Sequence, residues 1–261
     1  DMDLVEELVA DDESIKGMWS IPKYSNPDGI TYSDSVVDRL AKMKTKAPDF
    51  RIFWDNAYAV HHLYDEHDNL KNILSACKNS GNPNRVLIFS STSKISFPGS
   101  GIAICAASTD NINYIKKQMS FQTIGPDKIN QLRHVKFFKN VSGIEQHMRK
   151  HAEILRPKFE AVLGILENEL SGKGIAWWNK PRGGYFISLN TMEGCAKAVV
   201  SMAADAGVKL TNAGATFPYG KDPLDRNIRI APSFPPLSEL KQAIELLCIC
   251  VQLVSIKAIM K

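Results

Sequence analysis

The sequence predicts an α/β fold, in which a mostly parallel sheet with crossover helices is followed by a smaller α+β unit. Over the first half of the chain, short segments rich in β-branched and aromatic residues alternate with helical segments, which is the pattern of a parallel sheet. The last quarter changes to short strands and one long terminal helix. We therefore expect two domains, with residues 1–140 in the first and residues 141–261 in the second.

Each predicted element is bounded by residues that form turns or helix caps. In the first part we predict strands at 17–23, 51–54, 85–90 and 101–107, and helices at 33–43 and 69–79. Further helices are predicted at 109–119, 127–138 and 142–170. Short strands at 184–189 and 227–230 and a terminal helix from Ser238 complete the prediction, and residues 1–10 form the end of a helix.

The composition excludes several classes of protein. The chain has 261 residues, and its 32 basic and 28 acidic residues give a net charge of +4 without basic blocks, so we expect no nucleic-acid partner. The longest unbroken apolar stretch, 246–251, is far shorter than the ~20 residues of a membrane span, so we expect no membrane partner. Five cysteines without a CxxC pair indicate buried free thiols in a reducing, cytoplasmic compartment.

A lysine follows the third predicted strand, in the tetrapeptide Ser-Thr-Ser-Lys that ends at Lys94. Ligand-binding residues of α/β sheets lie at such strand ends. A lysine buried there is costly unless it is neutralised, and a Schiff base with an aldehyde cofactor would neutralise it. The neighbouring hydroxyls of Ser91 and Ser93 could bind a phosphate group. The alternative is that Lys94 is simply solvated.

Polar residues that could bind a ligand also follow the first and second predicted strands, and one lies within the strand predicted at 227–230. Asp55 and Tyr58 come directly after the second strand, where a carboxylate could keep a heterocyclic nitrogen protonated and a phenol could bind a ring oxygen. Asp55 could instead cap a helix, and Asn26 could belong to an ordinary Asn-Pro turn. Arg229 lies in an apolar strand, where its guanidinium requires a carboxylate from the protein or from a substrate.

Together these residues form motifs in a characteristic order. The motifs SNPDG at 25–29, DNAY at 55–58, STSK at 91–94 and IRIAPS at 228–233 resemble those of the fold type I pyridoxal-phosphate aminotransferases of class I. The resemblance is strongest to the MocR-type aspartate aminotransferase-like enzymes, and the tracts at 125–138 and 181–186 fit the same group. It covers nearly all of the chain.

The resemblance implies a fold. The first 140 residues would be the later part of the family's large domain, forming a four-stranded remnant of a mostly parallel sheet in which the fourth strand is antiparallel. The remaining residues would form a C-terminal α+β small domain. Family members carry upstream segments that supply part of the phosphate site and a stacking aromatic residue. We therefore expect this chain to be the later part of a longer protein, with two open sheet edges and an exposed apolar face.

The resemblance also implies roles for individual residues. Lys94 would bind pyridoxal phosphate covalently and move the proton at the substrate α-carbon, and Asp55 would pair with the pyridine nitrogen. Asn26 and Tyr58 would bind the phenolic oxygen of the cofactor, Ser91 and Ser93 its phosphate, and Arg229, with Asn26 beside it, the substrate carboxylate. Many members have an arginine eight residues after the lysine. This chain has Ile102 there, which puts an arginine–phosphate contact in doubt.

These roles predict an aminotransferase that exchanges an amino group between an amino acid, aspartate or glutamate, and a 2-oxo acid. The whole protein would be a cytoplasmic homodimer. Two alternatives remain open: a lyase on the same scaffold, and a transcription regulator whose aminotransferase-like domain senses pyridoxal phosphate. The histidines at 61, 62 and 67 fit no structural zinc spacing, so we expect no metal site.

Overall fold

Contacts between residues divide the chain into two units in the computed structural model, which describes residues 1–260. Unit 1 consists of Asp1–Lys23, Thr31–Val60 and Asp68–Met148. Unit 2 consists of Tyr24–Ile30, His61–His67 and the chain from Arg149 onward. The predicted domain boundary near residue 140 stays a prediction about the whole protein.

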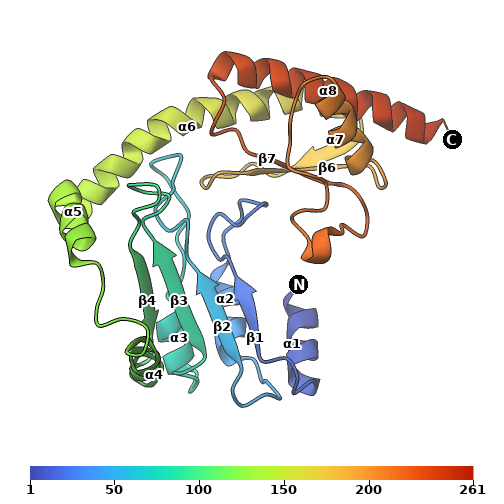
Figure 1. Cartoon of the computed structure of the whole chain (residues 1–261). Coiled ribbons are helices and arrows are strands. Elements are labelled where there is room, and N and C mark those ends of the chain that lie inside the picture. Colours follow the sequence, from blue (N-terminus) through green and yellow to red (C-terminus); the bar gives the residue numbers. More distant parts are fainter. Residues whose placement is uncertain (261) are drawn as a thin grey trace. The chain divides into compact units, whose positions relative to one another are not determined.

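A four-stranded sheet forms the centre of unit 1 (Figure 1). Its strands lie in the order β1 (Gly17–Ser20), β2 (Arg51–Asp55), β3 (Val86–Ser91) and β4 (Ala103–Ala107). The first three strands are parallel, and β4 runs antiparallel to β3. This confirms the predicted mostly parallel sheet with an antiparallel fourth strand. Within residues 1–260, neither β1 nor β4 has a strand partner on its outer edge.

The two faces of this sheet differ because successive side chains of a strand point to opposite faces. Ile52 and Trp54 of β2 are buried in a core shared with α2 (Asp34–Lys42) and α3 (Ile73–Asn79). On alternate positions, Trp19, Phe53 and Phe89 form a stacked row, with ring centroids 5.6 Å and 6.0 Å apart. Trp19 is 63% exposed, so unit 1 has the exposed apolar surface that the resemblance implied.

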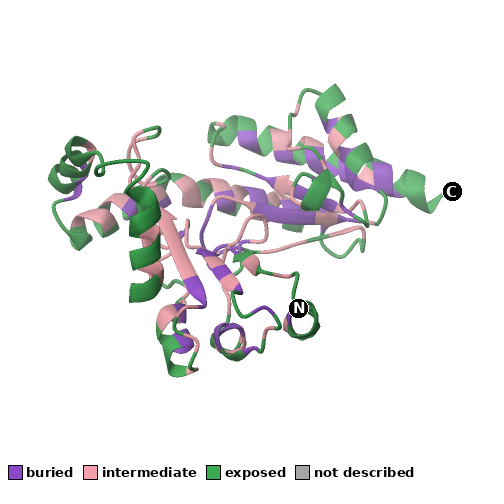
Figure 2. Ribbon diagram, turned by 60° about the horizontal axis from the view of Figure 1, so that its bottom comes forward, coloured by how far each residue is buried: buried purple, intermediate pink, exposed green. Residues whose placement is uncertain are grey.

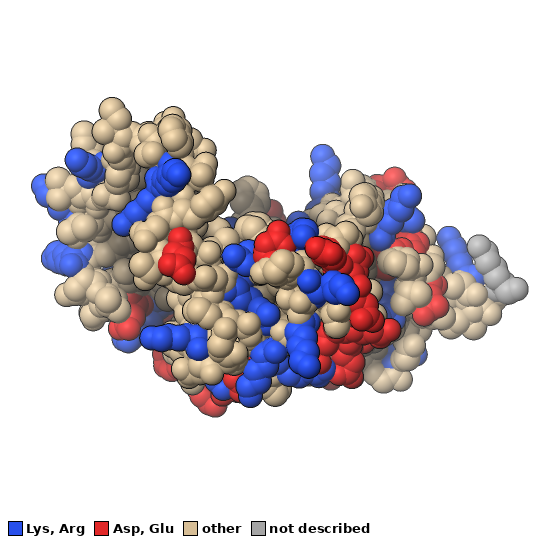
Figure 3. Space-filling view, turned by 90° about the horizontal axis from the view of Figure 1, so that it is seen from below, with Lys and Arg blue, Asp and Glu red and all other residues tan. Residues whose placement is uncertain are grey.

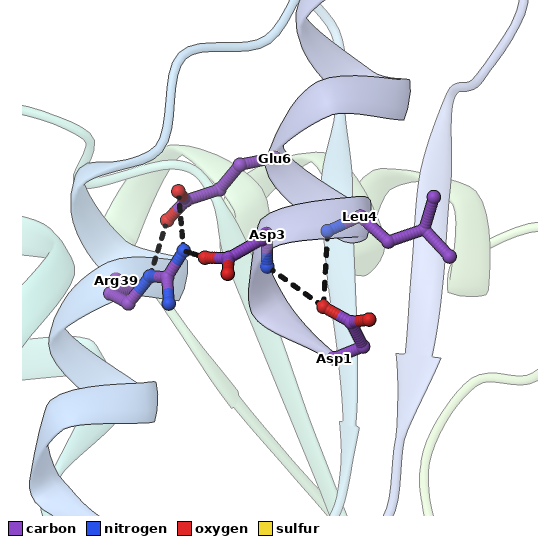
Figure 4. Close-up of polar contacts among 5 residues, drawn as sticks. All are labelled: Asp1, Asp3, Leu4, Glu6 and Arg39. Atoms are coloured by element: carbon purple, nitrogen blue, oxygen red, sulfur yellow. Dashed lines mark hydrogen bonds and ion pairs between the residues drawn. The ribbon is translucent and has the colours of Figure 1, made fainter.

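Helix α1 (Met2–Asp11) is held to α2 by charged side chains, as Figure 4 shows. The Asp1 carboxylate accepts hydrogen bonds from the first backbone N–H groups of α1 and so caps the helix. Arg39 of α2 forms a two-pronged contact with Glu6, at 2.8 and 3.0 Å, and also pairs with Asp3. These pairs are partly exposed, so they orient the two helices and contribute little to stability.

The C-terminal end of α2 is capped by a buried arginine. Arg85 Nη1 donates to the carbonyl of Met43 at 2.5 Å and to that of Ala41 at 3.3 Å. Both acceptors lie where the helix carbonyls have no partner within the helix. Desolvation lowers the pKa of the Arg85 guanidinium from its ordinary value. Arg85 thus fastens the start of β3 to the preceding layer of helices.

Three further helices follow the sheet: α4 (Thr109–Met119), α5 (Lys128–Phe138) and α6 (Val141–Leu170). Helix α4 has no buried residue, and α5 buries only His134 and Phe138 (Figure 2). The side chains of Ser108 and Asp127 cap α4 and α5, and serine and aspartate are among the preferred residues at this position. The exposed positions of this region include large apolar side chains: Tyr114, Phe121, Ile124, Ile129, Leu132 and Val135.

Unit 2 contains a three-stranded antiparallel sheet of β5 (Ala176–Trp178), β6 (Ile187–Thr191) and β7 (Asn227–Ile230). Its core also includes α7 (Ala196–Asp205), α8 (Leu237–Ile259) and residues of α6, and a short 3-10 turn (Pro218–Gly220) lies before β7. The antiparallel sheet confirms the predicted α+β unit. The prediction omitted β5 and α7.

By length and composition, α8 is the one helix among residues 1–260 that could cross a membrane. One face of α8 packs into the core of unit 2. The buried residues of the helix are Leu240, Ile244, Leu247, Cys248, Cys250, Val251, Val254 and Ser255. A helix with one apolar face against a core is the usual arrangement in globular units.

The five cysteines are free thiols, as predicted, and four of them are buried. Cys105 is the exception, because it lies on the edge strand β4 and is only partly covered. Burial raises the pKa of the Cys77 thiol to about 11 and that of Cys248 to about 12. Basic and acidic side chains lie interspersed on the face shown in Figure 3, consistent with the small net charge of +4.

Candidate active site

The carboxyl ends of β2 and β3 place the first group of predicted residues. Asp55 is the last residue of β2 and Ser91 the last of β3. Parallel strands end at the same edge of a sheet, and Asp55 is paired in register with Phe89. The Asn56 N–H extends the pairing by one residue, donating to the Phe89 carbonyl at 2.8 Å. The local sequence therefore presents Asp55 and Ser91 at one edge.

Lys94 and Tyr58 meet beyond this edge. The Lys94 ammonium nitrogen lies 5.6 Å from the centre of the Tyr58 ring, and the tyrosine is only 4% exposed. Lys94 itself is exposed in unit 1. The chain leaves the sheet in a turn directly after Ser91, and this turn carries Lys94.

That turn is organised around Thr92. The carbonyl of Thr92 accepts the N–H groups of Ile95 and Ser96, both at 2.9 Å. Thr92 is also bonded twice to Ile102: its N–H donates to the Ile102 carbonyl, and its hydroxyl accepts the Ile102 N–H, each at 2.9 Å. Ile102 thus serves the turn through its main chain.

A glycine allows the close approach of the two sides of this loop. A Cβ added to Gly101 would collide with the Ser93 hydroxyl and would lie 3.0 Å from the Ser93 Cα and backbone nitrogen. The Ser91 hydroxyl accepts the Ser93 N–H at 3.4 Å. Gly101 therefore leaves room for Ser93 beside Lys94.

The second group of predicted residues lies in unit 2. Arg229 of β7 is half-buried and donates through Nη1 to the Asn26 side-chain oxygen at 3.1 Å. Its Nη2 donates to the Thr211 hydroxyl at 3.2 Å, and the guanidinium lies 4.7 Å from the centre of the Phe186 ring. The Arg229 Nε is buried and has no hydrogen-bond partner among the described residues. The sequence predicted Arg229 and Asn26 but missed Thr211, which no motif marks.

The start of β7 is anchored by a buried carboxylate. Asp222 accepts the backbone N–H groups of Arg226 and Asn227 at 2.8 Å and that of Leu224 at 3.0 Å. Desolvation opposes its ionisation, but these donors outweigh it, and the pKa of Asp222 lies below its ordinary value. The Asn227 side chain in turn donates to Ser188 at 2.8 Å. This network fixes the strand two residues before Arg229.

The histidines next to the DNAY motif have packing and hydrogen-bonding roles in unit 2. The Tyr24 hydroxyl lies 2.8 Å from Nδ1 of His62, whose ring stacks on His67 with centroids 3.7 Å apart. A Cβ added to Gly183 would collide with the Tyr24 ring and the His61 carbonyl. Within residues 1–260, no three His, Cys, Asp or Glu side chains gather as a metal site.

The described chain thus contains two groups of the predicted residues, each within one unit. Unit 1 holds Asp55, Tyr58, Ser91, Ser93 and Lys94, and unit 2 holds Asn26 and Arg229. The first group combines an amine, a carboxylate, a phenol and two hydroxyls. The second presents a guanidinium held by neutral partners, so its positive charge is not cancelled by a protein carboxylate among those contacts.

The fold is that of the aminotransferases. It superposes with a TM-score of 0.97 on the crystal structure of an aspartate transaminase from Corynebacterium glutamicum, at 45% identity over 99% of this chain and 61% of that one. An aspartate aminotransferase of C. glutamicum is 46% identical over 253 residues, which are 97% of this chain and 58% of the relative. A Mycolicibacterium smegmatis protein named as an aminotransferase is 50% identical over 260 residues, covering 61% of its length.

The family is equally clear from the whole sequence, because the family model described as "Aspartate amino-transferase" matches residues 1–261. This chain belongs to the aspartate aminotransferase family. It spans about 60% of the length of the curated relatives that it matches.

Proposed function

We propose that the whole protein is a pyridoxal-phosphate-dependent aminotransferase, with Lys94 as the cofactor-binding lysine. The observation that carries the proposal is the position of Lys94, 5.6 Å from the Tyr58 ring and directly after the parallel strands that end at Asp55 and Ser91. Ligands of open α/β sheets bind at such strand ends.

The residues of unit 1 fit the cofactor chemically. The aldehyde of the cofactor requires an amine, and its pyridine nitrogen requires a carboxylate. Its phenolic oxygen requires a hydrogen-bond donor, and its phosphate group requires donors such as hydroxyl or N–H groups. Lys94, Asp55, Tyr58 and the two serines supply one group for each. Gly101 keeps the space beside Ser93 free of a side chain. The buried side-chain oxygen of Asn56, next to Asp55, has no hydrogen-bond partner among the described residues.

When bound, pyridoxal phosphate supplies a ring that accepts electron density from the substrate α-carbon. Lys94 holds the cofactor and then moves the proton at that carbon. Asp55 keeps the ring nitrogen protonated, because an anion nearby favours the charged form. Ser91 and Ser93 bind phosphate, and Tyr58 binds the phenolic oxygen, a role that the resemblance also gives to Asn26. Arg229, oriented by Asn26 and Thr211, binds the substrate carboxylate.

The proposed substrates are aspartate or glutamate and a 2-oxo acid. The support for these substrates is the similarity to proteins named aspartate aminotransferase and aspartate transaminase. A homodimer in the cytoplasm is proposed on the same family grounds.

Reduction with borohydride tests the proposed function. The protein is mixed with pyridoxal phosphate, reduced, digested, and the modified peptide is identified by mass spectrometry. We expect the label on Lys94. A label on any other lysine, or none, would overturn the assignment.

A substitution of Arg229 tests its role in substrate binding. Lysine keeps the charge but has one ammonium group, which cannot reproduce the planar fork held by Asn26 and Thr211. Hydrogen bonds to charged groups contribute about 1.5–3 kcal/mol each, so Arg229→Lys should raise KM for the amino acid roughly 10–100-fold. Steady-state kinetics measures this, with cofactor absorbance unchanged.

The matched control is Arg226→Lys, because Arg226 lies near the same strand and its guanidinium stacks on Trp177 instead, at 5.3 Å. Its KM should stay within a few-fold of the wild-type value. Equal KM values for the two variants would remove Arg229 from substrate binding.

A further inference from the structure

A buried histidine of α5 lies against the turn that carries Lys94. His134 is 5% exposed, and its Nδ1 is 2.9 Å from the backbone carbonyl of Asn130. A carbonyl can only accept a hydrogen bond, so this Nδ1 carries the proton and donates. In the neutral ring the other nitrogen, Nε2, is then an acceptor with one lone pair.

The acceptor nitrogen of His134 meets hydroxyls on both sides of Lys94. Nε2 lies 2.7 Å from the Ser96 hydroxyl and 3.0 Å from the Thr92 hydroxyl, and the Ser96 hydroxyl also lies 3.2 Å from the Thr92 carbonyl. Thr92 is the residue around which the turn is organised, through its carbonyl and its two bonds to Ile102. His134 therefore ties the beginning of the turn to its end, two residues before and two residues after the lysine.

Neighbouring contacts of α5 and α6 hold the same loop. Asn130, one helical turn before His134, donates through its side chain to the Ser100 carbonyl at 2.8 Å. From α6, the His147 Nε2 lies 2.8 Å from the Ile95 carbonyl and so donates to it. The Phe97 ring packs against the His134 ring with centroids 5.4 Å apart. Two helices thus contact the segment from residue 92 to residue 100.

We propose that His134 is a positioning residue, whose one acceptor nitrogen, Nε2, is shared by the hydroxyls of Ser96 and Thr92 and so fixes the conformation of the 92–96 turn and thereby places Lys94. This rests on the proposed role of Lys94. The turn on which Lys94 lies is bonded on both sides of the lysine, through Thr92 and Ser96. A reactive amine is most effective when the backbone that carries it has a fixed conformation. A misplaced amine lowers both the reaction rate and the affinity for the ligand.

Two substitutions of similar size separate the acceptor role from simple packing. In His134→Gln the side-chain oxygen reaches the place of Nε2 and can accept from Ser96 and Thr92. In His134→Asn the shorter amide reaches only the place of Nδ1, near Asn130. Positioning through Nε2 predicts that glutamine retains the turn and asparagine does not. Packing alone predicts similar behaviour for both.

Hydrogen exchange in the cofactor-free protein provides a readout that is independent of activity. The amides of Ile95, Ser96 and Ile102 are bonded to Thr92. In His134→Asn we expect these amides to exchange about tenfold faster or more, while amides of β2 and β3 stay unchanged, because local opening does not require global unfolding. In His134→Gln the same amides should exchange within a few-fold of wild type. The control Gln131→Ala, on an exposed position of α5, should change none of them.

Cofactor affinity gives the second readout. Titration with pyridoxal phosphate, followed by absorbance, should show at least about tenfold weaker binding for His134→Asn than for His134→Gln. Ser96→Ala, which removes the hydroxyl closest to Nε2 with little loss of volume, should shift affinity in the same direction as His134→Asn. Equal exchange and equal affinity in the Gln and Asn variants would overturn the proposal.

The failure of this inference is distinguishable from the failure of the proposed function. If borohydride labels a lysine other than Lys94, the function assigned to Lys94 fails, while the exchange experiment still reports on the turn. If Lys94 is labelled and the 92–102 amides do not respond to His134→Asn, the positioning role fails alone.

Discussion

Replacing Lys94 with arginine should abolish measurable transamination. Arginine keeps the positive charge, but its guanidinium is not deprotonated in proteins and cannot bind an aldehyde or move a proton at neutral pH. Loss of general acid–base catalysis alone costs about 10²–10⁴-fold in kcat, and the loss of covalent cofactor binding adds to it. Single-turnover absorbance kinetics with the amino acid substrate measures the effect.

The control for this variant is Lys116→Arg, because Lys116 lies in the last turn of α4, which has no buried residue. Its activity should equal that of the wild type. Melting curves of Lys94→Arg should also match the wild type, since Lys94 is exposed and its removal leaves the core intact. Retained activity in Lys94→Arg would contradict the proposed function.

Replacing Asp55 with alanine should lower kcat while the cofactor stays bound to Lys94. The carboxylate at the end of β2 is the proposed partner of the ring nitrogen, and without it the ring is a weaker electron acceptor. Loss of one electrostatic contact at a reacting centre typically costs about 2.7–4 kcal/mol, or about 10²–10³-fold in kcat. Asp55→Asn, which keeps the shape and removes the charge, should show a loss of the same order.

Absorbance of the bound cofactor distinguishes this effect from loss of binding. The matched control is Asp49→Ala, because Asp49 precedes the same strand and forms a surface ion pair with the exposed Lys16, at 3.0 Å. Such a surface pair contributes little, so activity and stability should hardly change. An unchanged kcat in Asp55→Ala would remove Asp55 from the proposed mechanism.

The local pattern of the sequence was sufficient for most elements of unit 1. Segments such as 51–54 and 85–90 are short, apolar and bounded by turn residues, so their strand character does not depend on distant contacts. The structure confirms them as β2 and β3 with ends shifted by one residue. In unit 2 the pattern was insufficient. Strand β5 has only three residues, and α7 has no side-chain cap at Cys195, so both depend on packing.

The candidate site divides in the same way. The predicted strand ends and the motifs singled out Asp55, Tyr58 and Lys94 as candidate site residues, because a parallel sheet presents residues at its strand ends along one edge. They did not predict Thr211 against Arg229 or His134 against Ser96. These partners are 18 and 38 residues apart in the chain, and no periodicity or turn chemistry links them.

The alternation of strands and helices in the sequence by itself predicted the class of fold, and the resemblance of its motifs implied the four neighbouring strands and the residues of the proposed cofactor site. Only the tertiary structure decided which of these residues are buried and what holds them. The motifs left open whether Lys94 is buried or solvated, and it is exposed in the described residues, because burial depends on how the chain turns after β3 and on the helices that pack there. Hydrogen bonds from α5 and α6 decide that turn, and they join residues that only folding brings together.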